Sequence, residues 1–270
     1  MNIQEMHNTF RTLGQQMGLQ LIRGILPESI DVYINEVITE KVHQEILAGV
    51  HTTLQDSVNT QSSTMQPINT FRNLYRSARY SIDTNDIGSN KKVSFYNAKN
   101  GYHIINIPTI DSDITLNDNE YKIQPMMFLG FSVEYENTLR GNAVACRLIG
   151  SDVLETTLRD YCNGASKDSP IVCLSSIPVI DDGIEKTGVI SCEQLEIFTN
   201  NSDKNSVKFL NIKYIKTPNV VKYDIEASKC INCDLPAYTH FEIVERAVGK
   251  FFASVGAQIP NAARQQQGQQ

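Results

Sequence analysis

The sequence predicts an α+β fold, in which helices from both ends of the chain form a bundle and the middle forms a large antiparallel β insertion. Apolar residues recur at helical spacing in the first 53 residues and again near the end of the chain. Between residues 90 and 228 they instead alternate with polar residues, which is typical of strands. Short polar turns separate these strand candidates, which favours an antiparallel sandwich or barrel.

The first 85 residues are expected to form an N-terminal helical region. Spacings of three and four residues predict a first helix over 3–22, and a second is expected over 28–53, with Pro27 at its start. The segment TFRNLYRSARYSI, residues 70–82, predicts a third, short helix. The apolar residues of the first helix are Ile3, Met6, Phe10, Leu13 and Met17.

Three arginines in that third segment, Arg72, Arg76 and Arg79, are the clearest basic feature of a chain whose net charge is −6. On a helix they would share one face. That face is a candidate contact for DNA phosphate or for an acidic neighbouring subunit; the simpler alternative is a solvated helix face. The acidic balance argues against a protein that wraps DNA, because such binding requires a basic surface.

Residues 86–230 are expected to form a β-rich insertion domain. In MMFLGFSVEYE, residues 126–136, alternate positions are apolar, which predicts a half-buried strand. A short helix is expected near 153–162, where Asp152 and Glu155 resemble a capping box.

Residues 231–256 are expected to supply a C-terminal helix, spanning 238–255. Val244, Val248 and Phe251 form its apolar stripe, and Glu242 can pair with Arg246 one turn later. The stripe needs an apolar partner far away in the sequence, and the N-terminal helices have matching stripes. Residues 257–270 are polar and of low complexity, so a disordered tail is expected.

No motif for catalysis, cofactor binding or metal binding stands out. Cys230 and Cys233 have metal-ligand spacing, but zinc requires two further ligands, and only His240 and Asp234 lie close by in the sequence. Two ordinary thiols are the simpler interpretation. The sequence has no P-loop and no G-x-S-x-G motif. We therefore expect no enzyme, no cofactor and no metal; a hydrolase that uses Asp111 and Asp113 is the competing hypothesis.

Several segments, in order along the chain, carry a family resemblance. They are LPESIDVYINEVITEKVHQEI, TFRNLYRSARYSI, IINIP, CRLIG with the following SDVLETTLRDY, KYIKTPNVV and CDLPAYTHFEIVERAV. Together they resemble the neck proteins of short-tailed bacteriophages, especially the ring-forming head-to-tail connectors of crAss-like phages. Such proteins are similar to tail-tubular and gatekeeper-type adaptors.

The resemblance implies a virion structural protein, assembled in the cytoplasm of the bacterial host. Twelve copies would form a ring between portal and tail, in contact with the portal and with neighbouring neck or tail proteins. Double-stranded DNA would pass through without sequence specificity, and an acidic channel wall would repel its phosphates. The alternative is a tail or baseplate module that recognises a saccharide or peptide at the host surface, although aromatic residues are sparse and Trp is absent.

Membrane partners are not expected. The N-terminal residues lack the basic start and apolar core of a signal peptide, and no apolar run reaches the length of a membrane span. The expected place of synthesis is a reducing cytoplasm.

Overall fold

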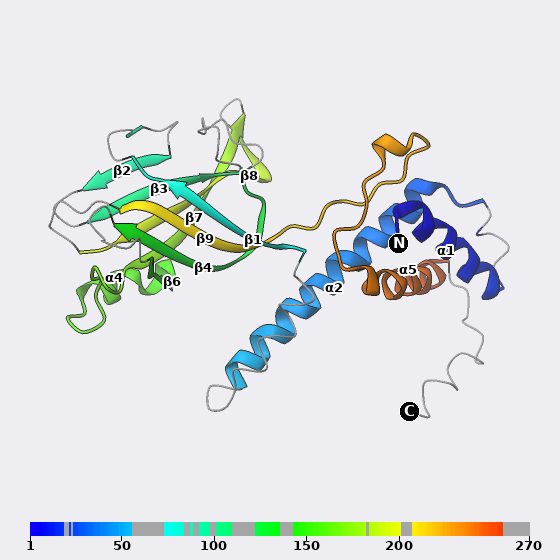
Figure 1. The fold of residues 1–270 in the computed structure, drawn as a ribbon, viewed down its shortest axis with the longest axis horizontal. Helices are drawn as coiled ribbons and strands as arrows, with labels where there is room; N and C mark the ends of the chain where they lie inside the picture. Colours follow the sequence, from blue (N-terminus) through cyan, green and yellow to red (C-terminus); the bar gives the residue numbers. More distant parts are fainter. Residues whose placement is uncertain are drawn as a thin grey trace. The chain divides into compact units, whose positions relative to one another are not determined.

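The predicted α+β class is confirmed by a computed structural model of the chain, with helices at both ends and antiparallel sheets in the middle (Figure 1). The chain divides into two compact units, a helical unit of residues 1–75 and 218–270 and a β unit of residues 76–217. The structure describes residues 1–18, 22, 24–55, 73–83, 87–88, 92–97, 101–109, 122–135, 143–181, 184–200 and 207–255.

In the helical unit, α5 (His240–Ser254) packs against both α1 (Ile3–Gln16) and α2 (Pro27–Gln55). The ring of Phe251 lies 6.1 Å from that of Phe10 and 5.7 Å from that of Tyr33, measured between centroids. The two ends of the chain therefore share one apolar core. This arrangement gives the stripe of the last helix the distant partner that it requires.

The start of α1 follows its sequence signals, but its end does not. Asn2 accepts a hydrogen bond from the backbone N–H of Glu5, whose side chain accepts from the N–H of Asn2 in return. The helix was expected to reach residue 22, but it ends at Gln16. Gly18 has a left-handed φ of 89°, the conformation that commonly terminates a helix.

The β unit contains two sheets. The four-stranded sheet has the order β1-β9-β4-β5 and the five-stranded sheet the order β2-β3-β8-β7-β6. Neighbouring strands are antiparallel in every pair whose register is resolved except β6 and β7, which are parallel. The strands are β1 (Tyr75–Ser81), β2 (Val93–Asn97), β3 (Tyr102–Pro108), β4 (Pro125–Tyr135), β5 (Val144–Ala145), β6 (Arg147–Ile149), β7 (Ile171–Asp181), β8 (Ile184–Phe198) and β9 (Val207–Lys216).

Side chains from both sheets form a single apolar core. They alternate along their strands with outward-facing residues, as the period of two predicts; in β4, Phe131, Val133 and Tyr135 are buried. The other members include Tyr80 of β1, Ile105 and Ile107 of β3, Leu195 and Ile197 of β8, and Leu210 and Ile212 of β9.

The helix predicted over residues 70–82 is wrong. Residues 75–81 form strand β1, in which Ala78 and Tyr80 are buried and Ser77 and Arg79 are exposed. An alternation of period two therefore governs this segment, because Tyr80 packs in the core between the sheets. The boundaries between the two units therefore differ from those expected from the sequence. Residues 76–85 belong to the β unit, and residues 218–230 belong to the helical unit.

The short helix of the β unit, α4 (Ser151–Arg159), begins earlier than expected. Its N-cap is Gly150, which makes no side-chain cap, so the expected capping box of Asp152 and Glu155 is wrong. Asp152 instead lies in the first turn, near the positive end of the helix dipole.

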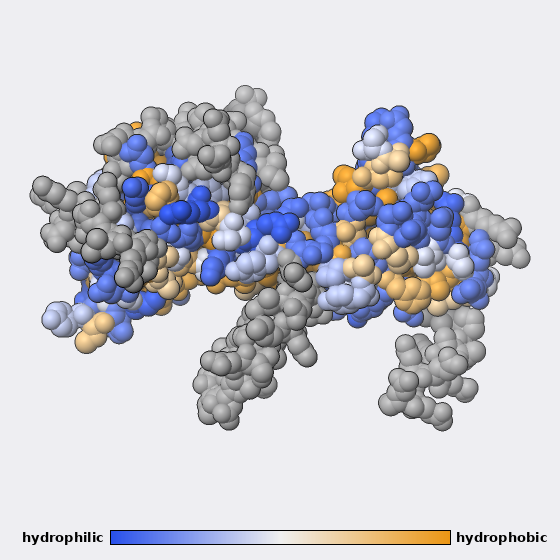
Figure 2. All heavy atoms as spheres, viewed as in Figure 1, coloured by the Kyte–Doolittle hydropathy of each residue, from blue (hydrophilic) through white to orange (hydrophobic). Residues whose placement is uncertain are grey.

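The helical unit exposes large apolar side chains, seen as orange areas in Figure 2. Part of this surface belongs to the segment 218–235, here called the arm, which returns from the β unit to α5. The amide of Asn35 bonds both backbone groups of Val221, so the arm is fastened to the first turns of α2. More than half of each of these side chains is exposed: Leu26, Val32, Val220, Ile225, Tyr238 and Phe241.

In the described part of the chain, no helix is both long and apolar enough to cross a bilayer. The predicted tail, residues 257–270, lies outside the described residues.

Candidate interaction sites

The three arginines singled out in the sequence do not form one face. Arg72 lies outside the described residues, whereas Arg76 and Arg79 both belong to β1. Successive side chains of a strand point to opposite faces, so residues three apart lie on different faces of the sheet. The shared arginine face is therefore wrong for Arg76 and Arg79.

Arg79 is engaged within its own sheet. Its guanidinium donates to Oε2 of Glu134 at 2.6 Å, and its central carbon lies 3.9 Å from the ring centroid of Phe209. The other carboxylate oxygen of Glu134 accepts from Nδ2 of Asn211 at 2.9 Å. The charge of Arg79 is thus largely compensated by Glu134, which leaves little of it for DNA phosphate.

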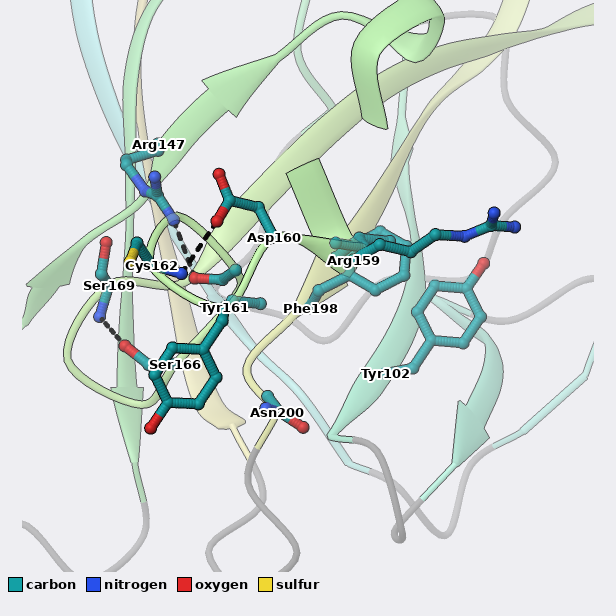
Figure 3. A pocket seen from close by; sticks show the side chains of 13 residues that line it. Tyr102, Arg147, Arg159, Asp160, Tyr161, Cys162, Ser166, Ser169, Phe198 and Asn200 are labelled. Carbon is teal, nitrogen blue, oxygen red and sulfur yellow. Dashed lines mark hydrogen bonds between the residues drawn. The ribbon is translucent and has the colours of Figure 1, made fainter. Parts of the chain in front are cut away.

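An open pocket lies on the outer face of the five-stranded sheet, beside the end of α4 (Figure 3). Its volume is about 920 Å³. Strands β3, β6 and β8 supply Tyr102, Arg147 and Phe198 to it, and the segment after α4 supplies its rim. Elements distant in the sequence therefore meet at one site.

The rim segment is held in a defined turn. The carboxylate of Asp160 accepts from the backbone N–H of Cys162 at 2.9 Å and from Nδ2 of Asn163 at 2.7 Å, and these bonds lower its pKa. Gly164 sits so close to the chain that an added Cβ would lie 2.7 Å from the carbonyl oxygen of Asp160. Glycine is therefore needed for this close approach.

Arg147, in strand β6, links the rim segment to the five-stranded sheet. One of its terminal nitrogens donates to the carbonyl oxygens of Asn163 at 2.7 Å and Gly164 at 3.0 Å. Its Nε is buried and has no hydrogen-bond partner among the residues that the structure describes. The guanidinium thus donates to neutral carbonyl oxygens, and the carboxylate of Asp160 lines the same pocket.

One wall of the pocket is aromatic. Tyr102 and Phe198 face each other across β3 and β8 in the strand register, and their rings stack at a centroid distance of 4.6 Å. The hydroxyl of Tyr102 donates to Glu196 at 3.0 Å. Burial, and then this carboxylate, raises the pKa of Tyr102, so its hydroxyl stays protonated at physiological pH.

The side chain of Tyr161, on the rim, is fully exposed. Arg159 is also exposed and lies 3.4 Å from Glu155, one turn earlier in α4. Such exposed pairs interact weakly, so Arg159 remains available to a ligand.

Sequence reasoning missed this pocket. The only local signal for it was the turn sequence after α4, in which Asp160, Asn163 and Gly164 favour a tight bend. The aromatic wall gave no such signal, because its members are almost a hundred residues apart.

The cysteine pair takes part in local structure in the helical unit. The Cys230 thiol donates to the carbonyl of Asp224 at 3.2 Å, and burial raises the pKa of Cys233 to about 11. Asp234 accepts twice from Asn219, and His240 bonds two backbone carbonyls.

Among the described residues, no three His, Cys, Asp or Glu side chains are placed to hold a metal ion. The hypothetical catalytic pair, Asp111 and Asp113, lies outside the described residues.

Comparison with known proteins adds no relative. No known protein family matches the sequence, and no curated protein shows significant similarity to it.

Proposed function

We propose that this chain is a structural protein of a bacteriophage neck, in which copies form a ring between portal and tail around the path of the genome. In this proposal the protein is not an enzyme. Its fold class agrees with what the family resemblance implies, namely a helical cluster from both chain ends with a β insertion.

The observation that carries the proposal is the exposed apolar surface of the helical unit. The arm is fastened beside the first turns of α2, and Val220 of the arm and Val32 of the helix are both exposed. Ile225, in the outer part of the arm, is 95% exposed. Apolar surface gathered in this way is typical of a protein–protein interface.

A ring requires contacts between two different surfaces of each copy, repeated around an axis. An arm that projects apolar side chains can supply one of these surfaces and a neighbouring copy the other. The net charge of −6 suits the role in the channel, because an acidic wall does not hold passing phosphates.

Light scattering on the purified chain, alone and mixed with the portal, tests the proposal. The expected mass is a large multiple of the 30.3 kDa chain. Ile225→Asp should lower that mass, whereas Lys229→Ser, an exposed change in the same arm, should not. A chain that stays monomeric even with the portal, and that is absent from averaged images of virions, would contradict the proposal.

A second candidate function is recognition of a saccharide or peptide at the host surface. The aromatic wall of Tyr102 and Phe198 in an open pocket favours it, since sugars stack on aromatic rings. Specific binding of the purified chain on a glycan array would support this function over the ring.

A further inference from the structure

The rim segment after α4 contains an Asn-Gly dipeptide, Asn163–Gly164, in which Asn163 is exposed. Asparagine followed by glycine is prone to deamidation, because glycine leaves its own backbone nitrogen open to approach. The nitrogen of Gly164, having lost its proton to hydroxide, attacks Cγ of Asn163 and forms a new N–Cγ bond. The Cγ–Nδ2 bond breaks, and Nδ2 takes a proton from water and leaves as ammonia. Water then opens the resulting succinimide to aspartate or isoaspartate.

The turn requires both members of this reactive pair. A Cβ at position 164 would lie 2.7 Å from the carbonyl oxygen of Asp160, closer than a Cβ can pack, so glycine is needed there. Asn163 supplies the Nδ2 donor that Oδ2 of Asp160 accepts at 2.7 Å. Neither residue can therefore be exchanged without disturbing the rim.

Arg147 favours the reaction through the peptide group that joins the two residues. One of its terminal nitrogens donates at 2.7 Å to the carbonyl oxygen of Asn163, which is conjugated with the N–H of Gly164. A cationic donor draws electron density toward that oxygen and polarises the peptide group. The nitrogen of Gly164 consequently loses its proton more readily, and this is the step that creates the nucleophile.

Asp160 opposes the reaction. Its Oδ2 accepts from Nδ2 of Asn163, and its Oδ1 accepts from the backbone N–H of Cys162 at 2.9 Å (Figure 3). The first bond restrains the amide of Asn163, so its Cγ does not turn freely toward the nitrogen of Gly164. The same bond is the main cause of the lowered pKa of Asp160. This carboxylate therefore stays ionised in mildly alkaline solution, where hydroxide makes succinimide formation fast.

We propose that Asn163–Gly164 is a deamidation site that Asp160 keeps unreacted, and that its conversion loosens the rim of the pocket. The new carboxylate at position 163 is ionised at neutral pH and has no proton to donate to Asp160. The bond between the two side chains is therefore lost, and two like charges face each other in its place. The inference needs neither a ring nor a partner, so it stands apart from the proposed function.

The test follows deamidation of Asn163 in the full chain, kept in mildly alkaline buffer either folded or unfolded in guanidinium chloride. Pepsin digestion in acid, where succinimides form slowly, and peptide mass spectrometry give the converted fraction. The folded wild type should convert more slowly than the unfolded chain, and Asp160→Ala should accelerate the folded chain by about fivefold or more. The matched control is Asp168→Ala, which removes an exposed carboxylate from the same segment and should leave the rate unchanged.

Asn163→Asp tests the consequence directly. Hydrogen exchange of the rim amides, above all that of Cys162, should be faster in this variant than in the wild type, because its partner Asp160 is less firmly held. Asp168→Ala is again the control and should exchange as the wild type does.

Equal rates for Asp160→Ala and Asp168→Ala, or for the folded and unfolded wild type, would overturn the protective role of Asp160. Unchanged exchange in Asn163→Asp would overturn the loosening of the rim. Asp160→Asn keeps the shape of the side chain but offers a weaker acceptor, so it should accelerate conversion less than Asp160→Ala does. It decides the same question if circular dichroism shows that Asp160→Ala does not fold.

Discussion

Nε2 of His7 in α1 lies 2.8 Å from Oδ1 of Asp31 in α2, and both side chains are buried. Oδ2 of the same carboxylate accepts from the backbone N–H of Tyr223 at 3.0 Å, and the ring of Tyr223 stacks on His7. A single carboxylate thus joins the first helix, the second helix and the arm.

Replacing Asp31 with Ala should destabilise the helical unit by about 1–3 kcal/mol, because the buried His7 and the half-buried N–H of Tyr223 lose their acceptor. Urea unfolding followed by helical circular dichroism measures the change. Glu28→Gln, at an exposed position in the same helix, is the control and should have an effect below about 0.5 kcal/mol. Equal effects of the two substitutions would show that the buried network does not hold the arm.

Stability should fall as the pH falls from about 6.5 to 4, and His103 should account for much of the loss. Burial lowers the pKa of this core histidine to about 4, and that of His7 is also lowered, mainly by burial. A lowered folded pKa means that the unfolded chain binds protons more readily. Stability is therefore complete above the unfolded pKa and is lost as the pH falls through the folded one.

For His103 the loss at pH 4 should be about 3 kcal/mol. Thermal unfolding of the wild type and of His103→Phe at pH 7 and pH 4 measures it, and the variant should lose less stability between the two. The control is His43→Gln, at an exposed position of α2. A variant as sensitive to acid as the wild type would contradict this assignment.

Phe251→Ala should cost the helical unit about 3–5 kcal/mol, because the ring fills the core between α1, α2 and α5. Val255→Ala, in the turn that follows α5, trims a residue that is 45% exposed and should have little effect. Chemical unfolding measures both. Similar losses for the two variants would mean that the last helix does not pack on the first two.

The predictable parts of the fold are those in which local period and burial agree. The apolar stripe of α5 is read directly from the sequence and is buried as expected. The alternation in β4 is buried as expected at Phe131, Val133 and Tyr135, whereas Leu129 is exposed, next to a register shift between Phe128 and Gly130. Strand β1 was missed because Leu74, Tyr75 and Ala78 imitate a helical stripe. Burial of Tyr80 in the sheet core decides that segment, and this is a tertiary effect that no local pattern contains.

The pocket could not be predicted for a related reason. Tyr102 and Phe198 become neighbours only through the register of β3 with β8, and Arg147 reaches the site from β6. Strand pairing over nearly a hundred residues depends on the whole sheet. The sequence could indicate the turn at Asp160, but not what the turn faces.

The last prediction concerns Glu242, whose predicted pairing with Arg246 is present at 2.8 Å. A second partner was not foreseen: Nζ of Lys41, a mostly buried ammonium on α2, lies 2.6 Å from Oε2 of Glu242. The hydrogen bond from Lys41 is the main cause of the lowered pKa of Glu242. The two partners differ in solvent exposure: the side chain of Arg246 is 47% exposed and that of Lys41 is 10% exposed.

Glu242→Gln should therefore destabilise the helical unit by about 1–2 kcal/mol, since it leaves the buried charge of Lys41 without a carboxylate. Adding Lys41→Met should recover most of that loss, because the buried charge is then absent and the aliphatic stem still packs. Arg246→Gln, the control on the exposed side, should cost less than about 0.5 kcal/mol. A double-mutant cycle by urea unfolding measures the coupling. Additive losses for Lys41 and Glu242 would show that the buried ammonium does not depend on this carboxylate.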